Sequence, residues 1–255
     1  MKTFRLIGAA LLAVLMCANF ASCSKDGDAN TDTGGEDVVV GEKKLVKMVS
    51  NEETYTFSYD GEGRLSSATE TDDDGDKYSY KFVWGDDAVV AQYKYETASG
   101  YNNGKTYTET YTLKDGLVQD WMSDNHSGIY SYNSSNRLIK AEFTDHFGYT
   151  VNAVWDKDKL VSVNINDTYP AILTYGETCK KGYFPLISDI IEFGDVLFMA
   201  HPEIAGMRTN QLPNTYSPED EEFTLTYEYD KEGYISKIKM KNEDGESETY
   251  TLTWK

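Results

Sequence analysis

Acidic side chains are the residues of this chain whose spacing comes closest to a known site. Glu70, Asp72, Asp74 and Gly75 occupy the first, third, fifth and sixth positions of a calcium-binding loop. The twelfth position is Lys81, where such a loop needs a bidentate glutamate. A hairpin turn built on Asp74 and Gly75 is therefore the better interpretation, and the sequence predicts neither a metal site nor a cofactor.

Histidines and the remaining carboxylates give no stronger signal for catalysis. The three histidines, His126, His146 and His201, are too scattered for a zinc motif. The sequence contains no Gly-x-Ser-x-Gly elbow and no glycine-rich phosphate loop, so neither an esterase nor a nucleotide enzyme is indicated. Two carboxylates could still meet as a glycosidase pair about 5 or 9 Å apart, but most acidic residues lie in predicted turns. No catalytic residue is predicted.

The first residues of the chain carry a modification signal. An apolar run over residues 6–18 follows Lys2 and Arg5, and residues 20–23 end in Cys23. The run is too short to span a hydrocarbon core, which takes about 20 residues. This pattern resembles the signal peptide and lipobox of bacterial lipoproteins. We therefore expect residues 1–22 to be removed and Cys23 to carry acyl chains that hold the protein on a membrane.

A tether follows the expected lipid site. Residues 24–42 are rich in Asp, Gly, Thr and Asn and cannot form a core. A flexible segment covering residues 23–42 would place the next domain about 20 to 25 Å from the lipid. Residues 24–28 are acidic and resemble the surface-export signals of Bacteroidota lipoproteins, which predicts display on the outer face of the outer membrane. An acidic linker on the periplasmic face is the alternative.

The net charge of the mature chain limits the classes of partner that it can bind. Loss of residues 1–22 leaves 22 basic and 43 acidic residues, a net charge of −21. Such a surface repels phosphate backbones and disfavours nucleic acid, while neutral glycans, cations and basic partners stay open. The acidity could also serve only solubility. Since Cys179 is the one cysteine left besides Cys23, no intramolecular disulfide can form.

Residues 43–255 read as a single all-β domain. An aromatic residue, a short polar turn and an aliphatic residue recur along the chain. Apolar residues alternate at period two beside each turn, which is typical of antiparallel strands with one covered face. Consecutive hairpins of about fourteen strands predict an antiparallel meander that forms a strongly curved sheet or partly closed barrel. The units start at Tyr59, Trp84, Leu113, Tyr132, Trp155, Tyr175 and Tyr229.

One segment has helical rather than strand periodicity. Apolar residues recur at three and four within residues 183–205, after Pro185 and before Pro202. We expect one helix here, bent at Gly194, that packs on the concave face of the sheet. Residues 206–219, with two prolines, are expected to form a long loop.

These patterns resemble known repeats. Tyr59, Asp60, Gly63 and Leu65 are spaced as in the tyrosine–aspartate repeat of RHS-type proteins, and the other copies are degenerate. The whole of residues 43–255, with its hydrophobic insertion and a stretch containing Gly206, Asn210, Leu212 and Pro213, is similar to a family of Bacteroidota lipoproteins with a domain of unknown function. The resemblance implies an envelope location and brings no catalytic residues.

Aromatic residues supply the remaining functional hypothesis. The chain has 20 tyrosines and four tryptophans, most of which should pack in the core. Those near loops could bind a ligand, and the candidate residues are Tyr101, Trp121, His126 and Asn210. The favoured function is non-catalytic binding of a glycan, a peptide or a partner protein. A hydrolase acting on an envelope polymer, or a structural or adhesion element, is the alternative.

The lipid site yields a direct prediction. Replacing Cys23 with Ala removes the acyl acceptor, so the protein should move from the membrane fraction to the soluble fraction on cell fractionation. A protein that stays on membranes after this change would contradict lipid anchoring at Cys23.

Overall fold

The computed structural model describes residues 42–97, 104–124, 126–144, 148–166, 170–191, 193, 195–218 and 221–255. The expected signal peptide, Cys23, the tether up to residue 41, Tyr101 and Gly194 lie outside the described residues. The elements are β1 (Leu45–Val49), β2 (Glu53–Tyr59), β3 (Leu65–Asp72), β4 (Lys77–Trp84), β5 (Ala88–Glu96), β6 (Thr106–Lys114), β7 (Leu117–Ser123), β8 (His126–Tyr132), β9 (Leu138–Thr144), β10 (Tyr149–Asp156), β11 (Lys159–Ile165), β12 (Ala171–Thr178), α1 (Ile187–Ile190), α2 (Val196–Ala200), the 3-10 helix η1 (Pro202–Ala205), β13 (Gln211–Ser217), β14 (Phe223–Tyr229), β15 (Ile235–Asn242) and β16 (Ser247–Trp254).

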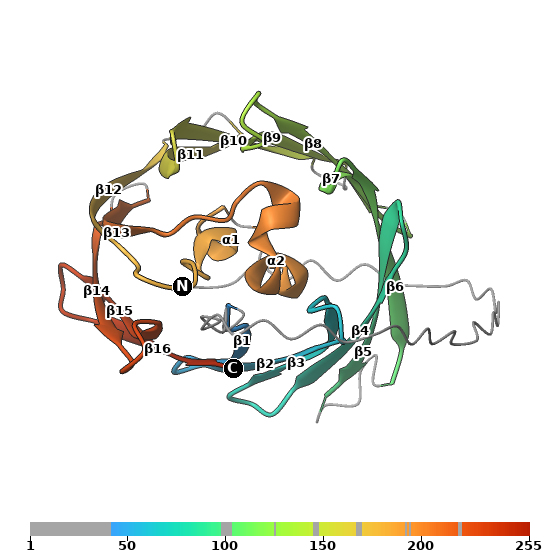
Figure 1. Cartoon of the computed structure of the whole chain (residues 1–255), viewed down its shortest axis with the longest axis horizontal. Helices are drawn as coiled ribbons and strands as arrows, with labels where there is room; N and C mark the ends of the chain where they lie inside the picture. Colours follow the sequence, from blue (N-terminus) through green and yellow to red (C-terminus); the bar gives the residue numbers. More distant parts are fainter. Residues whose placement is uncertain are drawn as a thin grey trace, which may run out of the picture.

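Sixteen strands form one closed barrel (Figure 1). Every strand pairs antiparallel with its neighbours in sequence, and β1 closes the barrel by pairing Met48 with Leu252 of β16. The predicted all-β antiparallel meander is confirmed. The barrel has two strands more than expected and is fully closed, so no strand edge is left for pairing with another chain.

The alternation along each strand separates the interior from the wall's outer face. In β15, Ile235, Ile238 and Met240 are buried, whereas Lys239 and Lys241 on the opposite face are exposed. In β14, Phe223 and Leu225 are buried between exposed threonines. In these two strands the apolar side chains therefore face inward and the polar side chains face outward. Elsewhere the outer face also carries exposed apolar side chains, among them Val83, Ile129 and Val154. Within the described residues, no helix is long and apolar enough to cross a membrane.

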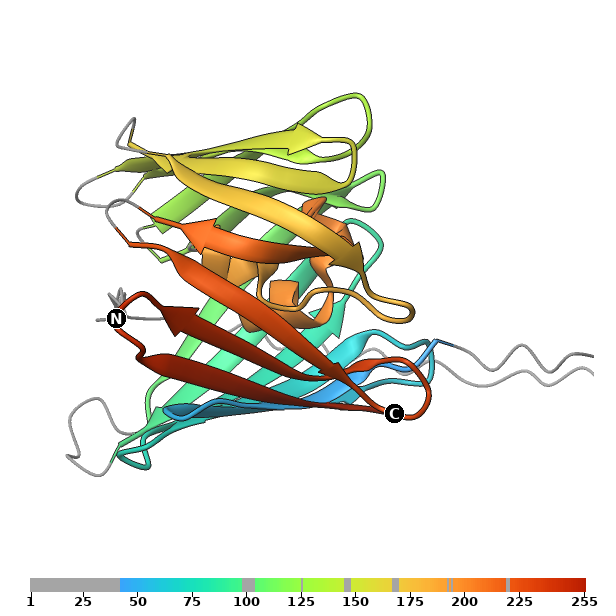
Figure 2. The same cartoon turned by 90° about the vertical axis from the view of Figure 1, so that its left-hand side faces the viewer.

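An insertion between β12 and β13 lies inside the barrel (Figure 2). It consists of two short α-helices and η1 instead of the single bent helix expected over residues 183–205. The break follows from Asp195, which is extended and whose side chain accepts a hydrogen bond from Leu197 N–H at 2.8 Å, capping α2 as a separate helix. The concave face is covered by a helical insertion, as the sequence predicts.

The expected loop over residues 206–219 is wrong for its central part. Gln211–Ser217 forms strand β13, which pairs with β12 along its length. Pro213 is tolerated because its partner Tyr175 lies at a register shift between the two strands, where a missing N–H donor breaks no regular ladder.

A ring of side chains fixes one end of the barrel. The first inward residue of each odd-numbered strand is an aliphatic side chain with 0% exposure. Near the end of seven of the eight even-numbered strands, an aromatic side chain donates a hydrogen bond of 2.5–2.8 Å to a carbonyl at the start of the preceding strand. We call this aromatic set the girdle; its members are Tyr59, Trp84, Tyr132, Trp155, Tyr175, Tyr227 and Trp254.

The turns at the girdle end use the chemistry that the repeat predicts. Asp60 Oδ1 accepts hydrogen bonds from the N–H groups of Glu62 and Arg64, both at 2.9 Å. Asn133 and Asp230 do the same in their own turns. The positive φ angles expected at Gly63, Asn136 and Gly233 are 77°, 59° and 93°. Each turn thus satisfies its own backbone donors and joins an even-numbered strand to the next odd-numbered one.

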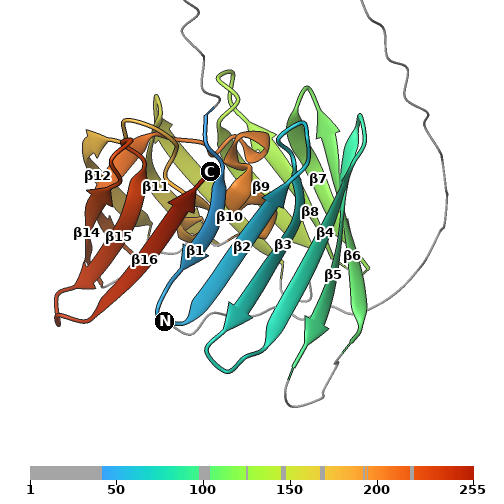
Figure 3. The same cartoon turned by 60° about the horizontal axis from the view of Figure 1, so that its bottom comes forward.

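The insertion is attached to the girdle end by polar contacts. His201 Nε2 accepts a hydrogen bond from Leu65 N–H at 2.9 Å, and its ring packs edge-on against Tyr59 and Trp84. Because Nε2 accepts, the proton of the neutral ring is on Nδ1, which donates to Glu203 Oε1 at 2.8 Å. Figure 3 shows the helices toward the end of the barrel that holds the C-terminus.

Gly206 ends η1 where the insertion touches a turn. Its φ is +64°, and a Cβ there would lie 2.4 Å from the carbonyl oxygen of Asn136. Gly206→Ala should therefore lower the free energy of unfolding by about 2–4 kcal/mol, measured by urea denaturation. Gly61→Ala is the matched control, since a Cβ there meets nothing within 4 Å. Equal stability of the two variants would contradict the close approach.

Candidate functional site

The interior beyond the insertion, away from the girdle, differs in character from the girdle end. Its inward side chains include many tyrosines and several carboxylates beside Trp121 and Phe143, and most of them are half-buried. We call this region the chamber and define it by Tyr80, Tyr93, Tyr107, Glu109 and Trp121 of the wall and Asp189 and Asp195 of the insertion.

Stacked tyrosines form one side of the chamber. The ring centroids of Tyr93 and Tyr107 are 5.1 Å apart and those of Tyr80 and Tyr93 are 5.4 Å apart. Tyr78 stacks on Tyr95 at 4.5 Å nearer the rim. These rings lie on β4, β5 and β6, where inward positions alternate in register. They form a continuous aromatic surface across three strands.

Two carboxyl groups meet at one tyrosine hydroxyl. Tyr111 Oη contacts Glu109 Oε2 at 2.9 Å and also contacts Asp195 Oδ2. A hydroxyl has one hydrogen, so it donates to one carboxylate and can bond the second only if that group carries a proton. Burial raises the pKa of both carboxyls, and the like charge of Asp195 raises that of Glu109 further. The pair therefore holds a proton more readily than free acids do.

Asp189 of α1 is the third carboxyl of the chamber, after Glu109 and Asp195. Burial, followed by repulsion from Glu53, Glu248 and Glu70, raises the pKa of Asp189 to about 7. Among the described residues, no Lys or Arg forms an ion pair with Asp189, Asp195 or Glu109. The chamber is thus an acidic environment without a basic counter-charge from the described part of the wall.

Tyr107 has a hydroxyl group without a partner. The residue is 5% exposed, it lies on the inward face of β6 next to Glu109, and its Oη makes no hydrogen bond to any described group. A buried hydroxyl without a partner costs free energy, so its retention beside the carboxyls marks a place for an additional polar group.

The residues singled out from the sequence fall in different places. Trp121 lies in the chamber, where its indole hydrogen-bonds the Glu109 carboxyl. His126 begins β8 at the same end of the barrel. Asn210 lies at the girdle end, in a separate pocket. Tyr101 is outside the described residues. Among the described residues, no group of three His, Cys, Asp or Glu side chains is arranged to hold a metal ion.

Glu109, Asp189 and Asp195 were not predicted from the sequence, although two signals were present. Glu109 occupies an inward position between Tyr107 and Tyr111, where the alternation calls for an apolar residue. Asp189 and Asp195 interrupt an apolar helical segment. A carboxyl where the pattern demands an apolar side chain is a stronger indication of a site than the abundant acidic residues of the turns.

Comparison with known proteins gives the fold and no family. No family model and no curated protein matches the sequence. A solved structure titled a porin-like protein from Bacteroides uniformis superposes with a TM-score of 0.62 at 16% identity, covering 84% of this chain and 97% of that one. A second porin-like protein, from Bacteroides vulgatus, covers 84% of this chain and 86% of that one at 12% identity, with a TM-score of 0.31. The first similarity concerns the barrel fold alone.

The pKa of Asp189 predicts how stability depends on pH. A carboxyl whose pKa is raised by folding binds a proton more tightly in the folded state, so stability falls as pH rises from about 4 to 7. At pH 8, Asp189→Asn should therefore have a free energy of unfolding about 1–3 kcal/mol higher than the wild type, measured by urea denaturation. At pH 4 the two proteins should differ little. Asp86→Asn in the exposed β4–β5 turn should show no such pH-dependent gain. A stabilisation by Asp189→Asn that is equal at both pH values would contradict the raised pKa.

Proposed function

We propose that this protein is a lipid-anchored envelope protein that binds a positively charged group of a glycan or peptide in the chamber, without catalysis. The observation that carries the proposal is the combination of three half-buried carboxyls, stacked tyrosine rings and the unpartnered hydroxyl of Tyr107 in one interior.

Electrostatics favours a cation over an anion or a neutral group. Burial raises the pKa values of Glu109, Asp189 and Asp195, and like charges raise those of Glu109 and Asp189 further. A bound ammonium or guanidinium group would supply the missing opposite charge, stabilise the carboxylates and release protons. An anion would meet repulsion from the chamber and from a chain of net charge −21 after signal removal.

Tyrosine rings complement such a ligand. A cation within about 6 Å of a ring face gains roughly 0.5–2 kcal/mol, and a sugar or peptide segment can pack on the same surface. The Tyr93–Tyr107 stack lies beside Glu109 on the wall, so a ligand on the rings would bring its polar groups near the carboxyl and the free hydroxyl.

The outer wall supports anchoring by lipid instead of insertion into a bilayer. A lipid-facing barrel carries an apolar outward band about 25 Å tall. Exposed apolar side chains do occur on the outer face of other strands, among them Val83, Ile129 and Val154. The outward residues of β15, however, include Lys237, Lys239 and Lys241, and those of β16 include the exposed Thr251 and Thr253, so an apolar band does not run around the whole wall. We infer that the barrel stays in water at the outer membrane, tied to it through Cys23, on the cell surface. We also infer that the girdle repeat is a degenerate tyrosine–aspartate repeat.

Hydrolysis is the second candidate, because two buried carboxyls face the same tyrosine hydroxyl. A glycosidase pair needs its carboxyls on either side of the scissile bond, with substrate or water between them. Tyr111 Oη already occupies that space, so the arrangement favours binding. Cleavage of envelope glycans by the wild type, lost in Glu109→Gln, would instead support hydrolysis.

A matched pair of ligands tests the binding proposal. Full-length mature protein carrying Cys23→Ala would be titrated calorimetrically with glucosamine oligomers, which carry amines, and with their N-acetylated counterparts, which are neutral. We expect the amine form to bind, and to bind more tightly at pH 8 than at pH 6 as far as its amines stay charged, because Asp189 is largely protonated at the lower pH. Failure of both oligomers and of a lysine-containing peptide to bind would contradict the proposal.

Two tyrosine variants test whether the ligand binds in the chamber. Tyr107→Phe removes only the unpartnered hydroxyl, so it should keep or raise the stability of the fold while weakening binding about three- to tenfold. Tyr175→Phe makes the same chemical change in the girdle, where the hydroxyl donates to Leu160 O at 2.8 Å. It should lower stability by about 1 kcal/mol and leave binding unchanged. The reverse pattern would exclude the chamber as the site.

A further inference from the structure

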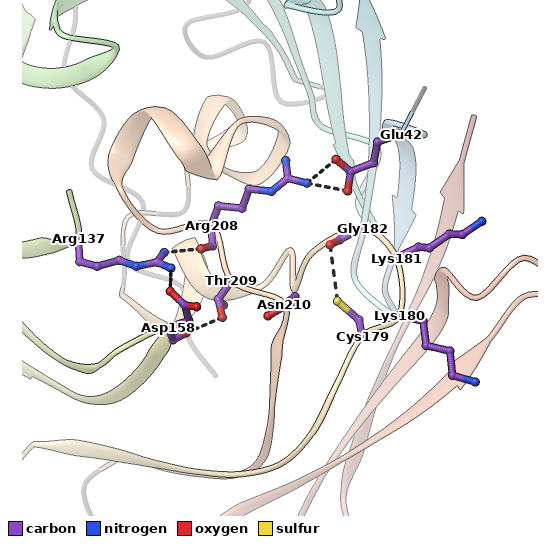
Figure 4. Close-up of a pocket in the computed structure, with 10 residues that line it drawn as sticks. All are labelled: Glu42, Arg137, Asp158, Cys179, Lys180, Lys181, Gly182, Arg208, Thr209 and Asn210. Carbon is purple, nitrogen blue, oxygen red and sulfur yellow. Dashed lines mark hydrogen bonds and ion pairs between the residues drawn. The ribbon is translucent and has the colours of Figure 1, made fainter. Parts of the chain in front are cut away.

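A pocket lies at the girdle end, where the insertion meets the turns of the wall (Figure 4). Its cavity volume is about 400 Å³, and it is formed where the insertion leaves β12 and returns to β13. Four of its lining residues are basic, Arg137, Lys180, Lys181 and Arg208, against two acidic ones. This local excess of positive charge contrasts with the strongly acidic chain as a whole.

The two arginines of this pocket are held differently. Arg137 packs over the Trp155 ring at 5.0 Å, donates to the carbonyl oxygen of Arg208 and pairs with Asp158. Its guanidinium therefore holds the segment that leads into β13 and is not free to bind a ligand. Arg208 packs over the Tyr183 ring at 5.1 Å, and its guanidinium points toward Glu42 (Figure 4).

Arg208 is occupied by a carboxylate from the chain's own tether. Its Nη2 lies 2.7 Å from both carboxylate oxygens of Glu42. Glu42 is exposed, precedes β1, and contacts the pocket through this ion pair. Glu203 is farther away, at 3.8 Å from Nη1. An exposed ion pair of this kind contributes little to stability, so another anion can replace Glu42 at small cost.

We propose that this pocket binds a phosphate group, with Arg208 as its principal ligand and Glu42 as a built-in competitor for the same guanidinium. Arginine suits phosphate because its planar fork offers several N–H donors to the phosphate oxygens. Lys180 and Lys181 are exposed at the rim, where their side chains point away from Arg208 (Figure 4), and Lys181 Nζ lies 5.6 Å from the centre of the Tyr234 ring. They add positive charge to the surroundings of the pocket and are not direct ligands. Asn210, the one residue predicted from the sequence that lies here, adds a side-chain amide.

The position of Glu42 gives the source of the phosphate. Glu42 lines the pocket, precedes β1, and is the last residue of the tether that the sequence predicts between Cys23 and the barrel. The tether expected from the sequence over residues 23–42 would span about 25 Å, which would place the pocket within range of phosphate-bearing headgroups. The site itself is independent of the proposed chamber function, and only the lipid source of its phosphate depends on anchoring at Cys23.

Charge-matched variants test the site. Using the full mature chain with Cys23→Ala, inorganic phosphate would be titrated and binding followed by calorimetry. Glu42→Gln removes the competitor and should tighten binding about three- to tenfold. Glu232→Gln makes the same change in net charge at a nearby exposed residue that pairs with Lys43 instead of Arg208, and should leave the affinity unchanged. Arg208→Gln should abolish binding.

Flotation with vesicles separates the two sources of phosphate. Binding to phosphatidylcholine vesicles that contain phosphatidic acid, but not to phosphatidylcholine alone, supports a lipid headgroup; binding of free phosphate without vesicle binding supports the site with a soluble phosphate. No phosphate binding by the folded Glu42→Gln variant, or equal gains from Glu42→Gln and Glu232→Gln, would overturn the proposal. Neither result bears on ligand binding in the chamber.

Discussion

The width of a sixteen-stranded barrel is the constraint on which this structure depends. Such a wall encloses more volume than its inward side chains can fill, and wide barrels of this size leave a water-filled lumen unless another segment enters. Here the insertion between β12 and β13 supplies that segment. It packs against the girdle end, where the aliphatic ring is fully buried, and leaves the other half of the interior to tyrosines and carboxyls that water partly reaches.

The girdle explains why the insertion has a fixed position. Each aromatic donor ties the end of one strand to the start of its predecessor, so the carbonyls at this end are satisfied within the wall. The N–H of Leu65 instead donates a hydrogen bond to His201 of the insertion. Gly206 of the insertion packs against Asn136, which is possible only because glycine has no side chain. The helices that carry Asp189 and Asp195 are thereby held at a fixed depth in the barrel. Contacts at the girdle end therefore determine where these two carboxyls lie in the chamber.

The repeat made the fold predictable, because one local pattern recurs with the same consequence each time. The aromatic residue marks the end of a strand, the polar residues form a turn that satisfies its own backbone donors, and the aliphatic residue begins the next strand with a buried side chain. None of these three features depends on long-range contacts. Closure of the barrel was not predictable in this way, since the pairing of β1 with β16 depends on total twist and strand number. Strand β13 was missed because a bulge at Tyr175 accommodates Pro213, which no local rule reveals.

The site was less predictable than the fold for a related reason. Trp121 was singled out by its position near a loop, but its importance comes from Glu109 and Asp195, which lie 86 residues apart in number and meet only through the closed barrel. Those carboxyls oppose folding at neutral pH because burial disfavours their charge. The aliphatic ring and girdle offset that cost at the opposite end of the barrel. The contacts that stabilise the fold and the proposed binding site thus lie at opposite ends of the barrel, so the chamber can keep groups that a uniformly packed interior would exclude.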